Sequence, residues 1–159
     1  MDTLLTWVVC AVGLCGAELA YWLPLKKRRN FTMRTALNFI AAVPFAQVII
    51  WANSGHAKPA MLLVIYGGYF IWAAVSTHLC TLLDWSASAY CSIWIVLTTE
   101  SAYELWRVLV WTAKALGMRH LPLHSTPMLL GQLGFTIACC VTVRYTMART
   151  MPEDGIYHT

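Results

Sequence analysis

Residues 3–34 read TLLTWVVCAVGLCGAELAYWLPLKKRRNFTMR, an apolar run that ends before a proline and passes directly into a cluster of basic residues. The apolar part, residues 3–23, has the length of about 20 residues that a helix needs to cross the hydrocarbon core of a bilayer. Basic residues do not precede this run, and no small-residue cleavage site with a soluble chain behind it follows. We therefore expect a membrane span that stays in the mature protein.

The whole chain has the composition of a membrane protein. Hydrophobic residues make up 59% of it and charged residues 11%, whereas a soluble domain carries about 25% charged residues. Four more apolar stretches follow the first, at residues 35–52, 60–83, 87–111 and 128–147. The sequence predicts an all-α fold, a polytopic membrane helix bundle of about five transmembrane helices formed by residues 1–147. Residues 148–159 are expected to form a short cytoplasmic tail.

The positions of the basic residues predict how the bundle is oriented. If the N-terminus faces out, seven Lys and Arg residues lie on the inner side and four on the outer side. Five of the seven lie close together: Lys26, Lys27, Arg28, Arg29 and Arg34. We expect a multi-pass protein of the plasma membrane with its N-terminus outside and its C-terminus in the cytoplasm. Because the cluster is a topology signal, no nucleic acid is expected as a partner.

Single residues refine the predicted helices. Pro44 lies inside the second stretch, where its missing N–H group is expected to kink the helix unless a neighbour compensates. Asp84 precedes the fourth stretch and is expected to be the N-cap of a helix that starts near Trp85. The six cysteines all lie inside apolar runs and form no CxxC pair, so we expect buried apolar side chains and no metal site.

Glu18 is an ionisable residue within the first stretch, and such a side chain costs about 3 kcal/mol at membrane depth unless it has a partner. It lies near the predicted inner end of the span, close in sequence to Lys26–Arg29. We expect its carboxylate to reach the inner surface and to pair with these bases. A role in binding a proton or a ligand is the alternative.

Glu100, Glu104 and Arg107 are spaced as i, i+4 and i+7, which places them on one face of the fourth helix. This face is expected to point into the bundle or to lie at the outer interface, because its charges are unstable against lipid. Glu104 can pair with Arg107, which leaves Glu100, deeper by about 6 Å, to contact a cationic or hydrogen-bonding group of a ligand. A structural ion pair is the favoured interpretation of this face, and ligand binding is the alternative.

His78 stands alone within the third stretch. A lone histidine in a membrane span is more often a hydrogen-bonded packing residue than a haem ligand, and haem needs a second axial ligand at the same depth. Three other histidines lie in predicted outer loops, namely His56, His120 and His124. We therefore expect no cofactor, and we keep His78 with the three residues of the charged face as a candidate ligand-binding residue.

Catalytic motifs are missing from the sequence. It contains no P-loop, no GxSxG or HExxH motif and no phosphate-cradling glycine loop. We therefore expect that the chain is not an enzyme.

Parts of the sequence resemble the multi-spanning sensor region of GHKL-type bacterial histidine kinases, relatives of the accessory-gene-regulator peptide receptors. The first 34 residues carry the most specific likeness: AELA at 17–20, LPL at 23–25, the bases Lys26–Arg29, Phe31 and Arg34. Residues 84–94, in which Tyr90 and Cys91 open a span, and residues 149–157 are similar to later parts of such regions. The likeness covers most of the chain.

The resemblance implies a bacterial inner-membrane sensor that receives an extracellular signal, often a peptide, and changes the state of a cytoplasmic kinase dimer. The 159 residues contain neither the phosphoacceptor helix nor the ATP-binding domain of that family, so no catalytic residue is carried over. We expect a signal-sensing module of two-component type that responds to an extracellular peptide or small ligand, as a homodimer or with a partner membrane protein. Its signal-facing rim is expected to combine the turn at 53–59, the face at 100–107 and the loop at 114–127.

Two alternatives to a sensor remain open. The first is a small transporter or transporter subunit, in which Pro44, Glu100 and His78 line a path near the midplane. The second is a membrane anchor or assembly subunit, in which the aromatic, glycine-bearing third helix packs on a partner protein.

Overall fold

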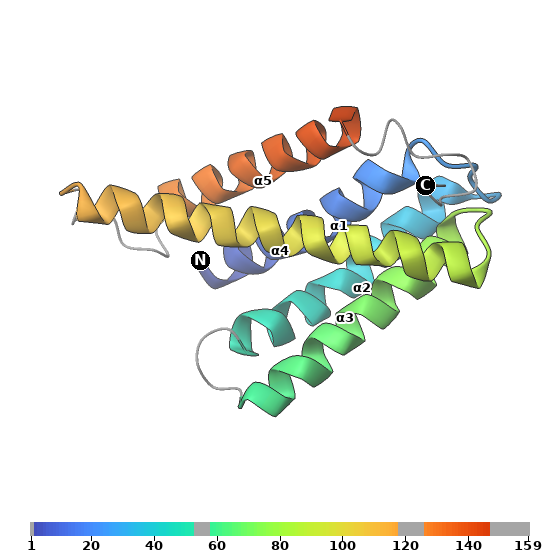
Figure 1. The fold of residues 1–159 in the computed structure, drawn as a ribbon, viewed down its shortest axis with the longest axis horizontal. Coiled ribbons are helices and arrows are strands. Elements are labelled where there is room, and N and C mark those ends of the chain that lie inside the picture. Colours follow the sequence, from blue (N-terminus) through green and yellow to red (C-terminus); the bar gives the residue numbers. More distant parts are fainter. Residues whose placement is uncertain (1, 53–57, 118–125, 147–159) are drawn as a thin grey trace.

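Five helices make up the part of the chain that the computed structural model describes, residues 2–52, 58–117 and 126–146 (Figure 1). In chain order they are α1 (Asp2–Trp22), α2 (Phe31–Trp51), α3 (Pro59–Cys80), α4 (Trp85–Ala115) and α5 (Thr126–Thr146). The predicted all-α bundle is confirmed. The predicted tail and most of the residues in the turn at 53–59 and the loop at 114–127 lie outside the described residues.

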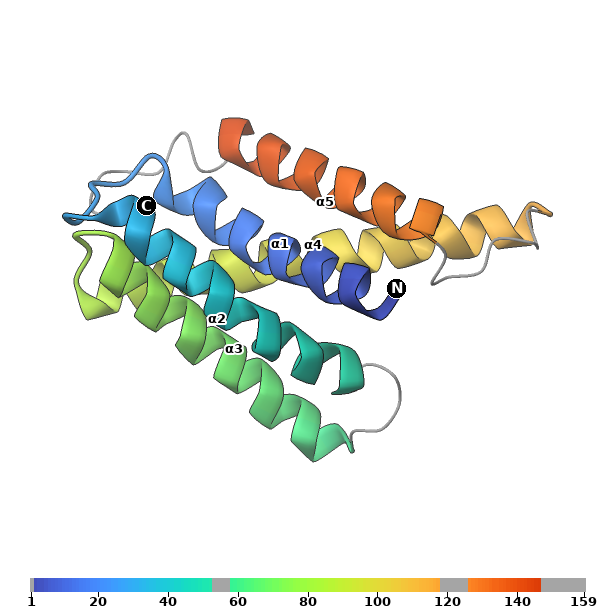
Figure 2. The same ribbon diagram turned by 180° about the vertical axis from the view of Figure 1, so that it is seen from behind.

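α1 lies at the centre of the bundle and contacts all four other helices. In both views it runs between α5 on one flank and the pair α2 and α3 on the other (Figures 1 and 2). In its most apolar window 50% of the residues are buried, against 17% in the windows of α2 and α5. Small side chains such as Ala11 and Ala17, both fully buried, allow the neighbouring helices to approach closely.

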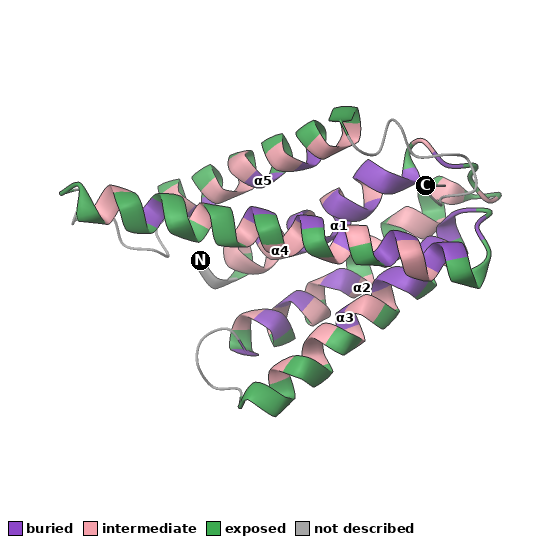
Figure 3. Ribbon diagram, viewed as in Figure 1, coloured by how far each residue is buried: buried purple, intermediate pink, exposed green. Residues whose placement is uncertain are grey.

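Four of the helices are long and apolar enough to cross a membrane: α1 over Leu4–Trp22, α2, α3 and α5. Figure 3 shows the exposed faces of α3 and α5, and large apolar side chains are exposed on the outward surfaces of the helices. On α2 and α3, Ile40 is 65% exposed, Leu63 78% and Val64 75%. Contact of these apolar side chains with water is unfavourable, whereas contact with lipid is not. The chain is therefore a multi-pass membrane protein.

α4 differs from the other helices in length and charge. It has 31 residues, so at 1.5 Å per residue it is about 46 Å long, well beyond the ~30 Å of a hydrocarbon core. Its second half contains Glu100, Glu104, Arg107 and Lys114, and its C-terminal end projects beyond the other helices (Figures 1 and 2). By length and composition α4 is not among the membrane-spanning helices, so the fifth span remains a prediction.

Pro44 does not interrupt α2, which is one helix from Phe31 to Trp51. The proline lies on an exposed side of the helix, directed away from the bundle. The helix also begins earlier than the predicted boundary at residue 35, because Arg34 N–H already donates to the carbonyl of Asn30. Asn30 has a φ of 62°, the left-handed conformation that asparagine tolerates and that turns the chain into the helix.

Asp84 is the N-cap of α4, as predicted. Its Oδ1 accepts a hydrogen bond of 2.7 Å from the backbone N–H of Ala87, and its own backbone is extended. This bond satisfies one of the N–H groups that a helix start leaves without a partner. The cap fixes where α4 begins and, with it, which of its side chains face the bundle.

Candidate functional site

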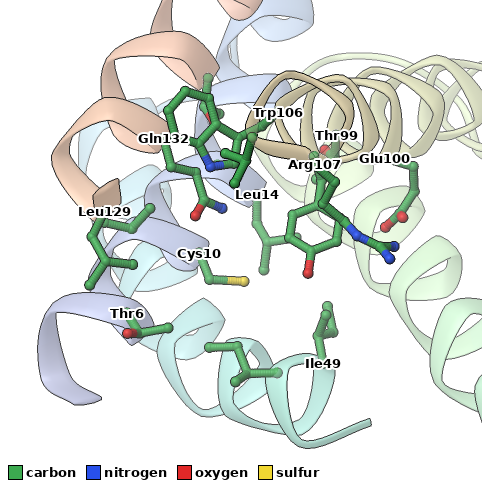
Figure 4. A pocket seen from close by; sticks show the side chains of 16 residues that line it. Thr6, Cys10, Leu14, Ile49, Thr99, Glu100, Trp106, Arg107, Leu129 and Gln132 are labelled. Carbon is green, nitrogen blue, oxygen red and sulfur yellow. The ribbon is translucent and has the colours of Figure 1, made fainter. Parts of the chain in front are cut away.

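A cavity of about 310 Å³ lies between α1, α2, α4 and α5 (Figure 4). It is formed by the first half of α1, the last turn of α2, the second half of α4 and the first half of α5. Much of the wall is apolar, and it includes Val9, Leu14, Ile49 and Leu129. The cavity therefore combines contributions from helices that are far apart in the sequence.

α4 supplies the polar wall of this cavity. Thr99, Tyr103, Trp106 and Val110 recur at intervals of three and four residues, the spacing of one helical face, and Glu100 and Arg107 flank that face. Figure 4 shows Glu100 and Arg107 on one side of the cavity, with Gln132 and Leu129 of α5 on the opposite side. The predicted charged face of the fourth helix thus borders an internal space.

Arg107 and Glu104 form the ion pair that the sequence predicts. Arg107 Nη1 lies 2.8 Å from Glu104 Oε1, and the two side chains are 61% and 56% exposed. The guanidinium also lies 5.9 Å from the ring centroid of Tyr103. Glu104 is not among the described residues that line the cavity, so within this pair only Arg107 borders it.

Glu100 is half-buried and has a different environment from Glu104. Its carboxylate is hydrogen-bonded to Tyr66 of α3, a neutral phenol. The like charge of Glu104 lies nearby, and no ion pair joins Glu100 to any described residue. Glu100 is therefore a carboxylate beside a cavity without a cation of its own.

Thr99 and Tyr69 brace the same part of α4 against α3. Tyr69 is fully buried, and its hydroxyl lies 2.9 Å from Thr99 Oγ1. Thr99 Oγ1 donates to the carbonyl of Ile95 at 3.0 Å, so it accepts the proton of the phenol. This bridge was not predicted from the sequence, although threonine hydroxyls commonly form hydrogen bonds between helices inside membranes.

His78 does not line this cavity, so the structure does not bring it together with Glu100. Its ring stacks on Trp85 with centroids 4.1 Å apart, near the start of α4. His78 lies 12 positions after Tyr66, the partner of Glu100 on α3. This offset corresponds to about 18 Å along the helix. Because α3 and α4 are antiparallel, a residue at the end of α3 faces the beginning of α4 and not its middle.

Glu18 is buried and does not pair with the basic cluster, so the predicted pairing is wrong. It is 1% exposed, and its Oε2 accepts a hydrogen bond from Asn38 Nδ2 of α2. Asn38 Oδ1 in turn accepts a hydrogen bond of 2.8 Å from Ser76 Oγ of α3. The other carboxylate oxygen, Oε1, has no hydrogen-bond partner among the described residues. Glu18 is thus a member of a polar network that joins three helices inside the bundle.

Two side chains of the basic cluster, Arg28 and Arg34, bind backbone carbonyls at the C-terminal end of α3. Arg28 Nε donates to the carbonyl of Thr81 at 2.7 Å, and Arg34 Nη1 donates to that of Leu79 at 2.7 Å. The backbone joins in, because Arg28 N–H donates to Cys80 O and Leu82 N–H donates to Lys26 O. Cations are favoured at helix C-termini, where carbonyl groups lack partners. We call residues 26–30, together with Arg34 in the first turn of α2, the docked loop.

No metal site is formed in the described ranges, where no three His, Cys, Asp or Glu side chains come together. Comparison of the chain with family models, with curated proteins and with solved structures gave no match.

Proposed function

We propose that this chain is the sensing module of a two-component-type receptor in a bacterial plasma membrane. It binds an extracellular peptide or small molecule in the cavity beside Glu100 and transmits occupancy of that cavity to the docked loop. The observation that carries the proposal is the pair of features at the two ends of the bundle. A cavity with charged groups in its wall lies at one end, and a hydrogen-bonded loop rich in cations lies at the other.

The charge asymmetry supports an outward-facing cavity. The docked loop holds most of the clustered cations, and such loops stay on the cytoplasmic side. The cavity is built from the opposite ends of α1 and α2 and therefore faces the outer side of the membrane. In this orientation the cavity receives signals from outside, while the docked loop meets cytoplasmic partners.

α1 supplies the physical link between the two ends. Cys10 and Gly13 line the cavity, and Glu18, five residues after Gly13, belongs to the buried network with Asn38. One turn later Trp22 Nε1 donates to Thr77 Oγ1 at 2.9 Å, beside the docked loop. A molecule that fits one arrangement of α1 better than another shifts the population of both ends together.

The alternatives find less support in the geometry. A transport path lined by Pro44, Glu100 and His78 is not supported, because Pro44 is exposed on the outside of α2 and His78 lies about 18 Å along α3 from the level of Glu100. An anchor accounts for the exposed first half of α3 but gives no role to the cavity.

Filling the cavity tests the sensing proposal without knowledge of the natural signal. A β-carbon on Gly13 would lie 3.5 Å from Thr136 Cγ2, an ordinary contact, so Gly13→Leu should fold and occupy the cavity. We expect the amide hydrogen exchange of Arg28 and Leu82 in lipid nanodiscs to change by about fivefold or more. Gly134→Leu is the matched control, because that glycine is exposed on α5 with nothing near it. Unchanged exchange in Gly13→Leu would show that the cavity and the docked loop are not coupled, and it would contradict the proposed sensing function.

A further inference from the structure

We infer that the cavity between α1, α2, α4 and α5 takes a small organic cation, a protonated amine on an apolar body, with the amine at Glu100. The amine belongs either to a free small molecule or to the amino terminus of a peptide. This inference rests on the proposed ligand-sensing function and specifies the chemistry of what is sensed.

The balance of charge in the wall favours a cation. Among the described residues, Glu100 and Arg107 are the charged groups that line the cavity, and Arg107 already pairs with Glu104 at 2.8 Å. Within the described ranges, Glu100 is hydrogen-bonded to the neutral phenol of Tyr66 and lies near the like charge of Glu104. The face therefore carries two carboxylates and one guanidinium, and the carboxylate without a cation is the one at the cavity.

An anion or a neutral molecule fits this wall less well. An anion in the cavity would be repelled by Glu100. The positive charge of Arg107, which would attract it, is already paired with Glu104. A protonated amine gains the attraction of Glu100 in a setting from which water is partly excluded, where that attraction is stronger than in bulk solvent. The rings of Tyr103 and Trp106 also border the cavity, and their faces attract cations.

The rest of the cavity defines the remainder of the molecule. Val9, Leu14, Ile49 and Leu129 line it from three helices and offer contacts to an aliphatic or aromatic body. Its volume of about 310 Å³ lies at the lower end of the roughly 300–1,000 Å³ of ligand pockets. A single aromatic or aliphatic group with its amine fits this space. Of a longer peptide, only the terminal residue fits.

The test measures equilibrium binding of 2-phenylethylamine to the chain in nanodiscs of zwitterionic lipid at neutral pH, with empty nanodiscs as background. 2-Phenylethanol and phenylacetate are the neutral and anionic comparisons of similar shape. We expect the amine to bind about tenfold or more tightly than either comparison. Equal binding of the three probes to the unaltered chain overturns the inference, whether or not any variant folds.

Glu100→Gln removes the charge while keeping the shape, and we expect it to weaken amine binding by about tenfold or more. Asp84→Asn is the matched control, because it removes one negative charge from the same helix and asparagine is also a good N-cap. Binding of the amine should survive in this control. Unchanged binding in Glu100→Gln overturns the assignment of the amine to Glu100.

The two sources of an amine are separated with the tripeptide amide Phe-Ala-Ala and its N-acetylated form. Tighter binding of the free-amine tripeptide than of 2-phenylethylamine assigns a peptide terminus, and the reverse order assigns a free amine; both support a cation. If the free tripeptide binds at least as tightly as 2-phenylethylamine, equal binding of its acetylated form overturns the inference. If Gly13→Leu still alters exchange in the docked loop, the sensing function stands even when the amine inference fails.

Discussion

The imidazole of His78 stacks on the indole of Trp85 with ring centroids 4.1 Å apart and an angle of 19° between the planes. The histidine Nδ1 lies 2.9 Å from the carbonyl oxygen of Leu83, which only accepts, so Nδ1 carries the proton. Nε2 then accepts from Arg28 Nη2 at 3.4 Å. His78 thus links the end of α3, the start of α4 and the docked loop.

Loss of this link should destabilise the end of the bundle that holds the docked loop. We expect His78→Ala to lower the free energy of unfolding in detergent by about 1–3 kcal/mol, because both the stacking and the bond to Leu83 are lost. His78→Phe keeps a ring against Trp85 and should recover part of the loss. Binding of 2-phenylethylamine should not change in either variant, because the cavity is elsewhere. A loss of amine binding with intact helicity would return His78 to the ligand site.

The Glu18 network should respond to shape more than to charge. Glu18→Gln keeps an acceptor for Asn38 Nδ2 and the size of the side chain, so we expect little change in the free energy of unfolding. Glu18→Leu leaves Asn38 Nδ2 without that acceptor and should cost about 1–3 kcal/mol. The two variants are compared by denaturant unfolding in the same detergent. Equal stability of Gln and Leu at this position would show that the hydrogen bond contributes nothing.

Two glycines of α5 should give opposite results on substitution. A β-carbon at Gly131 would lie 2.9 Å from Trp106 Cη2, so Gly131→Ala must displace the indole that borders the cavity. We expect a loss of about 1–3 kcal/mol in stability, together with weaker amine binding. Gly134 has open space around it, and Gly134→Ala should be neutral or stabilising by up to about 1 kcal/mol. Thermal unfolding and amine binding of the two proteins provide the comparison.

The orientation of the bundle is testable with single cysteines in intact cells. Lys58 and Arg29 are both exposed and lie at opposite ends of the bundle. With the N-terminus outside, a membrane-impermeant maleimide should label Lys58→Cys directly and Arg29→Cys only after the membrane is permeabilised. The unaltered chain measures the background from its native cysteines, which are buried or half-buried in the described residues. The reverse labelling pattern would invert the topology and place the cavity on the cytoplasmic side.

Local features of the chain were predicted well. The five helices follow from the five apolar stretches, although α2 begins four residues before its predicted boundary, and the capping role of Asp84 follows from its type and its position before such a stretch. The Glu104 to Arg107 pair follows from helical spacing, because two residues three apart lie side by side on any helix. These features depend on neighbours within about one turn, so no tertiary information is needed.

Features that join distant segments were not predicted. Glu18 was expected to pair with Lys26–Arg29 because they are close in sequence, yet the docked loop folds onto the end of α3 and satisfies its carbonyl groups. The spacing of residues in the sequence does not indicate that Asn38 binds Glu18 or that Ser76 binds Asn38. His78 and Glu100 looked like members of one site, because a sequence gives the depth of a residue along its helix but not the partner it meets there.

The amino-acid sequence by itself determined that this chain consists of helices and that several of them have apolar surfaces suited to lipid. Hydrophobicity and helical periodicity are properties of consecutive residues, so they can be recognised without tertiary structure. Only the tertiary structure decided which polar groups are satisfied by one another and which border a cavity. Those outcomes depend on how α1 packs among its four neighbours, and packing depends on the shapes of surfaces contributed by residues far apart in the chain.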